Sequence, residues 1–361
     1  MASLQALNPH IEEFVERSGF STNTFQPLAG DASTRSYMRV QSNSSKAILM
    51  IAPPNAEAAA CPPAASKAER ERLGYNAMAR LAGPNLSAFV EIANVLRSNG
   101  LAAPEIYAVD LKLGLALTED LGDELFARIA TSTNETELYE LAVDGLVLLH
   151  QQIETAPATS EFTIQDYDKL AYRTEASLFT EWYWPLFHGA EPISDLVEEF
   201  IAIFDDLLSE LAAPSTLVLR DYHAENLLFL PDRTGIERLG LIDFQDALMG
   251  SRAYDLVSLL EDARRDVSPH LQDAMIEKYC CSIESSKGLS VEQFQKEYAI
   301  LALQRNAKIL GVFARLAKRD GKTRYLELLP RVEAHFKRDL ARPEAATLKN
   351  FMGQHFAEKF S

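Results

Sequence analysis

The sequence predicts an α+β protein with two lobes, a small one built on an antiparallel sheet and a larger one that is mostly helical. The chain has 361 residues, which suffices for about two domains at roughly 150 residues each. Residues 1–120 alternate helical segments with short extended ones, as a small α+β unit does. After Glu124, apolar residues recur with a period of about 3.6, which is typical of amphipathic helices.

The first part of the chain predicts a helix followed by strands. A helix is expected over residues 1–20, because its apolar side chains share one face. Residues 26–40 read as two extended stretches on either side of a turn at Gly30 and Asp31. The apolar run at 46–52 predicts another strand.

The rest of the small lobe is predicted as a loop, a helix and a strand pair. Residues 53–72 are rich in Pro and Ala, and we expect a loop because prolines break helices and central strands. A helix is expected over residues 87–100, where Gly100 can end it. Residues 105–110 and 114–120 predict two strands joined by a short turn.

The large lobe is predicted to be helical with one small β region. Helices are expected over residues 135–153, 168–187 and 193–211, β segments over 216–220, 226–230 and 237–244, and helices again from 253 to the end.

Composition narrows the classes of function. The chain holds 35 Lys and Arg against 52 Asp and Glu, a net charge of −17, whereas nucleic-acid binders carry basic faces. Its three cysteines show no metal-ligand spacing and indicate a reducing compartment. The sequence shows no signal peptide and no apolar stretch of about 18 residues. We therefore expect a cytoplasmic protein with neither a nucleic-acid nor a membrane partner.

Three polar residues in the β region carry the chemistry. Asp221 and Asn226 lie five residues apart, and Asp243 follows at the end of an apolar segment. This is the order found in kinases, which need a carboxylate to orient and deprotonate an acceptor hydroxyl, and oxygen ligands for magnesium. Asp221 is the expected base, and Asn226 and Asp243 are the expected metal ligands. The five-residue spacing alone arises by chance in many proteins, and the strand ending in Asp243 strengthens the kinase interpretation.

The chain resembles the aminoglycoside phosphotransferase and choline kinase superfamily, and most of all the bacterial cell-wall amino-sugar kinases. Those enzymes use ATP to phosphorylate the anomeric hydroxyl of N-acetylmuramate and N-acetylglucosamine. The resemblance rests on GDASTRSYMRV at 30–40, ILMIAPP at 48–54, TEDLGD at 118–123, RDYHAEN at 220–226, LIDFQDALMGSRAYDLVSLLEDAR at 241–264 and KILGVFARLAKRDGKTRYLELLPRV at 308–332.

The resemblance implies a protein-kinase-like fold and a nucleotide site between its lobes. It implies a small lobe at 1–117, a hinge at 118–123 and a large lobe at 124–361. It also implies ATP and Mg²⁺ as cofactors. In the small lobe it implies phosphate contacts from the turn of Gly30, Asp31, Ala32 and Ser33, where backbone N–H groups can approach phosphate oxygens. In the hinge it implies backbone contacts of Glu119 and Leu121 with adenine. A simple hairpin turn is the alternative at Gly30 and Asp31.

Two features depart from the usual kinase pattern. No lysine of the small-lobe strand matches the one that pairs the phosphates, because Met50 stands there, and Phe89 is near the place of its glutamate partner. Since a triphosphate needs a cation, Arg35 and Arg39 are the expected substitutes. Solvated strand charges are the alternative for both arginines.

Four residues are candidates for acceptor contacts. His223 lies in the catalytic loop, Trp182 and Trp184 could stack on a sugar ring, and Arg305 opens a basic group in the last third of the chain. Each has a plainer interpretation, as a local hydrogen-bond partner, core aromatic residues or a solvated helix charge. Asp255 is expected to fix the catalytic loop through hydrogen bonds.

These observations predict an ATP-dependent kinase of a small-molecule hydroxyl, with an amino sugar of the cell wall favoured as acceptor. An aminoglycoside, choline or homoserine kinase is the alternative within the fold, and a non-catalytic nucleotide-binding protein is the alternative outside catalysis.

Overall fold

The small lobe is an antiparallel sheet of five strands in the order β1-β2-β3-β5-β4. The computed structural model describes residues 9–28, 35–42, 45–53, 61–81, 86–287 and 290–360. The strands are β1 (Ser21–Pro27), β2 (Ser36–Gln41), β3 (Lys46–Ile51), β4 (Ile106–Asp110) and β5 (Leu115–Glu119). The central pairing sets Leu49 of β3 opposite Leu117 of β5. The predicted turn at Gly30 and Asp31 lies outside the described residues.

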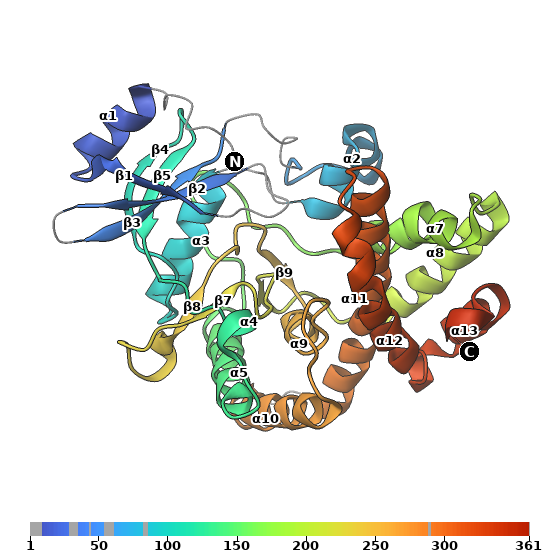
Figure 1. Ribbon diagram of the computed structural model, residues 1–361. Coiled ribbons are helices and arrows are strands. Elements are labelled where there is room, and N and C mark those ends of the chain that lie inside the picture. Colours follow the sequence, from blue (N-terminus) through green and yellow to red (C-terminus); the bar gives the residue numbers. More distant parts are fainter. Residues whose placement is uncertain are drawn as a thin grey trace.

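Two helices cover the two faces of this sheet (Figure 1). Helix α1 (Pro9–Arg17) contributes Phe14 and Val15 to a cluster that contains Leu49 and Leu117. Helix α3 (Leu86–Ser98) belongs to the main core, which also contains Met50. Because successive strand residues point to opposite faces, Leu49 belongs to the cluster on the α1 side of the sheet and its neighbour Met50 to the core on the α3 side.

The segment at 61–81 corrects the loop predicted over 53–72. Helix α2 (Lys67–Leu73) begins at Ser66, whose side chain accepts a hydrogen bond from the backbone N–H of Glu69 while the Glu69 carboxylate bonds the Ser66 N–H. This capping box satisfies two N–H groups that a helix start leaves unpaired, and Ser66 lies beyond the last proline. A π-helical turn, η1 (Asn76–Arg80), follows. Figure 1 shows α2 beside one end of α11, away from the sheet.

The large lobe is mostly helical. Its helices are α4 (Phe126–Ile129), α5 (Glu135–Gln152), α6 (Lys169–Ala176), α7 (Trp184–His188), α8 (Ser194–Ser209), α9 (Ala253–Leu260), α10 (Pro269–Lys287), α11 (Val291–Lys318), α12 (Leu329–Asp339), α13 (Ala346–His355) and α14 (Ala357–Phe360). Short helical turns are η2 (Phe179–Tyr183), η3 (Gly235–Arg238), η4 (Thr323–Leu328) and η5 (Pro343–Ala345).

Four short strands form the predicted β region of this lobe. They are β6 (Thr216–Val218), β7 (Leu227–Phe229), β8 (Leu239–Leu241) and β9 (Leu248–Gly250). Strand β6 pairs with β9 and β7 pairs with β8, both antiparallel. The two-lobed α+β architecture predicted from the sequence is confirmed. Within the described residues, no helix is both long and apolar enough to cross a membrane.

Candidate active site

The predicted catalytic loop joins β6 to β7 and is fixed by a buried carboxylate. Asp255 of α9 is fully buried and accepts hydrogen bonds from the backbone N–H of Leu219, at 2.6 Å, and of Arg220, at 2.8 Å. Arg220 has φ of 71°, a conformation that costs a non-glycine residue about 1–3 kcal/mol unless its surroundings hold it. Burial raises the pKa of Asp255 to about 7, against the two backbone hydrogen bonds. The predicted structural role of Asp255 is confirmed.

Asp221 is the exposed carboxylate at the head of this loop. Desolvation favours its neutral form, but the interaction with His223 and the charges of Lys308 and Arg220 outweigh desolvation, so the pKa of Asp221 lies below its ordinary value. Asp221 is therefore ionised at neutral pH. An ionised carboxylate can accept a hydrogen bond from a hydroxyl group and hold that group in place.

Asn226 turns its amide nitrogen toward the loop. Its Nδ2 donates to the backbone carbonyl of Asp221 at 3.0 Å and lies 3.4 Å from Nε2 of His223. This use of Nδ2 leaves the carbonyl oxygen Oδ1 as the atom that a cation can approach. His223 is buried, and desolvation lowers its pKa despite the nearby carboxylates of Asp262 and Asp221.

Asp243 follows β8, and an arginine of the small lobe lies against it. Its Oδ1 accepts a hydrogen bond from Nε2 of Gln245 at 2.9 Å and lies 3.9 Å from Nη1 of buried Arg35. Asp243 has φ of 61°. Desolvation, aided by the charge of Asp221, raises the pKa of Asp243 to about 6.

These oxygen groups fit a magnesium ion. A divalent cation would offset the desolvation and the repulsion from Asp221 that raise the pKa of Asp243, and carboxylate and amide oxygens are ligands that magnesium accepts. Across the described part of the chain, no cluster of three or more His, Cys, Asp or Glu side chains could hold a metal alone. Magnesium in kinase sites takes one or two protein ligands and completes its shell with phosphates and water.

The small lobe meets the site through an aromatic contact. Phe89 of α3 stacks on Phe244, the residue after Asp243, with centroids 5.2 Å apart and planes 8° from parallel. Met50 is buried in the core. Gly30, Asp31, Ala32 and Ser33 lie outside the described residues.

Arg39, the other expected cation of the small lobe, lies toward the predicted hinge. Arg39 donates to the carboxylates of Asp120, at 2.6 Å, and Asp123, at 3.0 Å. Lys46 begins β3 and is exposed.

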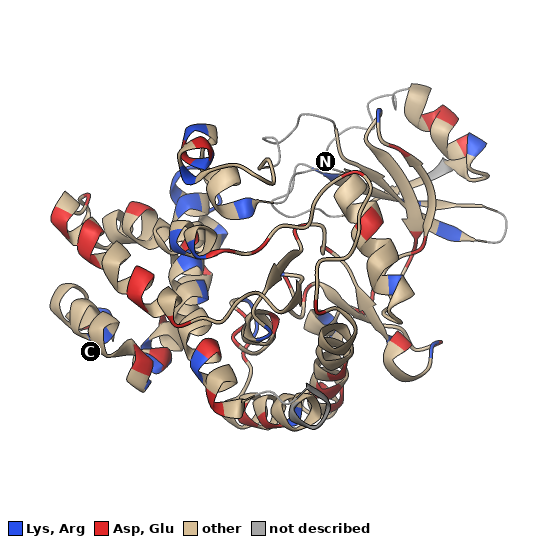
Figure 2. Ribbon diagram, turned by 180° about the vertical axis from the view of Figure 1, so that it is seen from behind, with Lys and Arg blue, Asp and Glu red and all other residues tan. Residues whose placement is uncertain are grey.

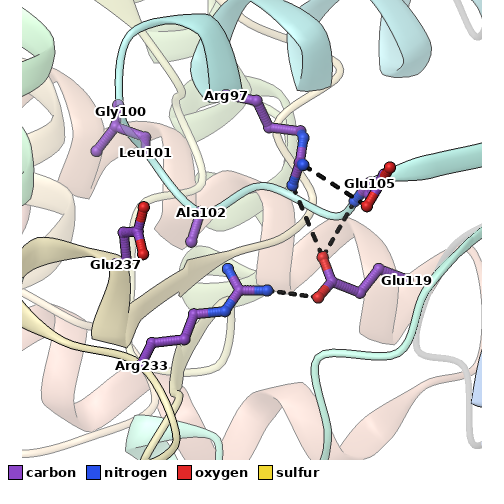
Figure 3. A pocket seen from close by; sticks show the side chains of 8 residues that line it. All are labelled: Arg97, Gly100, Leu101, Ala102, Glu105, Glu119, Arg233 and Glu237. Carbon is purple, nitrogen blue, oxygen red and sulfur yellow. Dashed lines mark hydrogen bonds and ion pairs between the residues drawn. The ribbon is translucent and has the colours of Figure 1, made fainter.

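The two predicted hinge residues, Glu119 and Leu121, have different surroundings. Leu121 is half-buried against Leu228 and Leu230. The carboxylate of Glu119 pairs with Arg97, 3.7 Å away, and with Arg233 of the large lobe (Figure 3). A polar cavity of about 260 Å³ lies here, and its lining includes neither Asp221 nor Asp243.

The candidates for acceptor contacts occupy three different environments. Trp184 is buried and packs on His355 and Phe356. Trp182 is half-buried on η2, against the core. Arg305 is buried, donates to Oγ of Ser258 at 2.8 Å, and contributes its charge to the lowered pKa of Asp221.

A buried charged network beneath Asp221 was not predicted. Glu175 of α6 accepts hydrogen bonds from Arg220, at 2.5 Å, and from the hydroxyl of Tyr167, and pairs with Lys308 at 2.8 Å. The two cations outweigh desolvation and lower the pKa of Glu175. No spacing marks Glu175, because its two cationic partners lie far away in the sequence.

Arg80 is a second residue that sequence reasoning missed. Its guanidinium binds Asp246, three residues after Asp243, through Nε at 2.8 Å and Nη2 at 3.1 Å. Its backbone carbonyl accepts a hydrogen bond from Arg220 at 2.9 Å. Arg80 thus ties the 61–81 segment to both sides of the site.

Comparisons with known proteins agree with this geometry. A model of the phosphotransferase enzyme family matches residues 24–294. A protein of Caulobacter vibrioides, named N-acetylmuramate/N-acetylglucosamine kinase, is 40% identical over 351 residues, which cover 95% of this chain and 94% of that protein. A protein of Pseudomonas aeruginosa with the same name is 31% identical over 328 residues, which cover 89% and 86%.

Solved structures share the fold at low sequence identity. An aminoglycoside phosphotransferase, APH(2'')-Ib, solved with bound ADP, has a TM-score of 0.53 and 15% identity, with 91% of this chain and 99% of that chain covered. Choline kinase LicA from Streptococcus pneumoniae also has a TM-score of 0.53 and 15% identity, with 90% and 99% covered. The fold is therefore the kinase-like one that the sequence predicted.

Proposed function

The chain belongs to the phosphotransferase enzyme family, and we propose that it transfers the γ-phosphoryl group of ATP to the anomeric hydroxyl of N-acetylmuramate or N-acetylglucosamine. The observation that carries this proposal is the 40% identity, over nearly the whole of both chains, with a protein named for these two sugars. The grouping of Asp221, Asn226 and Asp243 at the catalytic loop supports the phosphoryl-transfer part of it.

The proposed mechanism assigns the proton to Asp221. Its ionised carboxylate accepts the hydrogen bond of the acceptor hydroxyl and takes the proton as the sugar oxygen bonds to the γ-phosphorus. The bond from that phosphorus to the bridging oxygen breaks, and ADP leaves. An anomeric hydroxyl is more acidic than an ordinary alcohol, so a carboxylate of lowered pKa is a sufficient base.

The other residues hold and shield the nucleotide. Oδ1 of Asn226 and the carboxylate of Asp243 would hold Mg²⁺, which neutralises charge on the phosphates when bound. Residues 30–33, predicted from the sequence to form a turn, would bind phosphate through their backbone, and Glu119 and Leu121 would bind adenine. The proposal keeps a small lobe at 1–117, a hinge at 118–123 and a large lobe at 124–361.

The position of the phosphate group in the product tests the proposed acceptor. Purified protein incubated with magnesium-ATP and either sugar is expected to form a sugar 1-phosphate, which phosphorus NMR distinguishes from other esters. Choline and aminoglycosides should react little. A sugar 6-phosphate, or turnover with an aminoglycoside alone, would contradict the proposed acceptor while leaving phosphoryl transfer intact.

Arg35 is expected to serve as the phosphate-side cation that the β3 strand lacks. It is buried and lies 3.9 Å from Asp243, whereas Lys46 is exposed at the start of β3. The variant Arg35→Ala should therefore raise the KM for ATP by about 10-fold or more, the cost of losing a hydrogen bond to a charged group. Lys46→Ala is the matched control and should change KM less. The reverse ranking, measured by steady-state kinetics, would assign the cation to Lys46.

A further inference from the structure

One face of helix α11 contacts α6 at successive helical turns. Nε2 of Gln304 donates to the backbone carbonyl of Tyr172 at 2.8 Å. One turn later, Nζ of Lys308 pairs with Glu175 at 2.8 Å. Residues three and four apart share a helix face, so the same face continues to Arg315.

The next contacts bring this face onto η2. A Cβ atom on Gly311 would lie 2.3 Å from the backbone of Leu178, so glycine is required where the two elements cross. The contacts advance along both elements together, and Glu181 of η2 lies close enough to Arg315 for their charges to interact. The charge of Arg315 counteracts the desolvation that raises the pKa of Glu181, although the two side chains form no ion pair within the described residues.

Arg315 is half-buried and has no carboxylate partner in the described part of the chain. Its guanidinium carbon lies 5.2 Å from the ring centroid of Tyr75, and its buried Nε has no hydrogen-bond partner. Desolvation and the charge of Glu175 raise the pKa of Tyr75 to about 12, so its hydroxyl keeps its proton and can donate. Arg315 and Tyr75 thus offer hydrogen-bond donors here, and neither Glu181 nor any other carboxylate of the described residues lies within ion-pair distance of Arg315.

Lys and Arg colour much of α11 blue in Figure 2, and five basic residues of α11, its C-terminal end and α12 have a polar or acidic partner. Their partners are Ser258 for Arg305, Glu175 for Lys308, Asp320 for Arg319, Asp266 for Arg331 and Glu261 for Arg338.

We propose that Arg315, stacked on Tyr75, binds the carboxylate of the lactyl group by which N-acetylmuramate differs from N-acetylglucosamine. This inference rests on the proposed function. An arginine fork matches a carboxylate with two parallel hydrogen bonds.

The position of Arg315 along the helix suits this role. Lys308, whose charge acts on Asp221, lies seven residues before it on the same face, about 10.5 Å along the helix axis. In the proposed complex, a sugar that presents its anomeric oxygen to Asp221 extends its lactyl arm along α11 toward Arg315.

The test compares the two sugars in one enzyme. In Arg315→Gln, kcat/KM for N-acetylmuramate should fall about 10- to 100-fold further than kcat/KM for N-acetylglucosamine, as expected for a lost charged hydrogen bond. N-acetylmuramate with its lactyl carboxylate converted to the neutral amide should show the same loss with the wild-type protein. It should show little additional loss with Arg315→Gln, because the partner of the carboxylate is already gone.

Lys318→Gln is the matched control, because it removes one exposed positive charge a turn further along α11. Its ratio between the two sugars should equal the wild-type ratio, and melting temperatures establish that each variant is folded. Equal losses for both sugars in Arg315→Gln, or no loss for either, would overturn the role of Arg315. If the wild-type protein phosphorylates neither sugar, the proposed function itself fails, which is a separate result.

Discussion

Replacing Asp221 by asparagine is expected to lower kcat by about 10²–10⁴-fold, the usual contribution of a positioned acid or base. The amide keeps the size of the side chain but cannot accept the proton of the acceptor hydroxyl. The loop should keep its shape, because its backbone is held by Asp255 and by the amide of Asn226, which bonds the main-chain carbonyl of residue 221. Turnover is measured with saturating magnesium-ATP and sugar.

Nucleotide binding separates this role from a structural one. Asp221→Asn should bind magnesium-ATP within a few-fold of the wild-type affinity in a calorimetric titration. Glu225→Gln is the control for the loss of one negative charge from this loop, because Glu225 is exposed on the same loop and pairs with Arg264 at 2.8 Å. Turnover of Asp221→Asn close to the wild-type rate would defeat the assignment of the base.

Replacing Asp243 by alanine is expected to reduce turnover by about 10²–10³-fold or more, as the loss of a principal electrostatic group does. It should also weaken ATP binding in the presence of magnesium. Because the pKa of Asp243 is raised to about 6, the carboxyl takes up a proton as pH falls from 7 to 5 and then cannot serve as a cation ligand. Magnesium-ATP affinity of the wild-type protein should therefore decline over this interval.

Asp243→Asn provides the matched comparison. It has no proton to gain at residue 243, so its affinity for magnesium-ATP should be weak and nearly constant between pH 7 and pH 5. Full activity of either variant, or full wild-type activity without a divalent cation, would show that Asp243 is not a metal ligand.

Sequence spacing predicted the parts of the molecule that local chemistry determines. Apolar periodicity indicated the helices and strands of both lobes, and the order of Asp221, Asn226 and Asp243 indicated the catalytic loop and the strand beside it. The spacing works because Asn226 reaches the carbonyl of Asp221 within a single loop. Helix α2 was missed because the loop predicted from the prolines was extended past Pro63 to residue 72, and the capping residues Ser66 and Glu69 were not considered.

Long-range pairings could not be predicted in the same way. Glu175 joins Arg220 and Lys308, and Arg80 joins Asp246, across separations of 45 to 166 residues. Nothing in a linear pattern fixes which cation finds which carboxylate over such distances. The two tryptophans illustrate the same limit, since Trp182 and Trp184 are neighbours in sequence but differ in burial and contacts.

The docking of residues 61–81 limits how this enzyme could be recombined with its relatives. Arg70 bonds Asp168 at the start of α6, Arg80 bonds Asp246, and Tyr75 lies under Arg315. In a chimaera that joins residues 1–117 of this protein to the large lobe of a relative, Arg70, Arg80 and Tyr75 would face residues of the relative. Nucleotide preference and sugar preference should therefore not be exchanged separately by a junction at residue 117. A chimaera designed to change the acceptor must take residues 61–81 from the same protein as the helices that they contact.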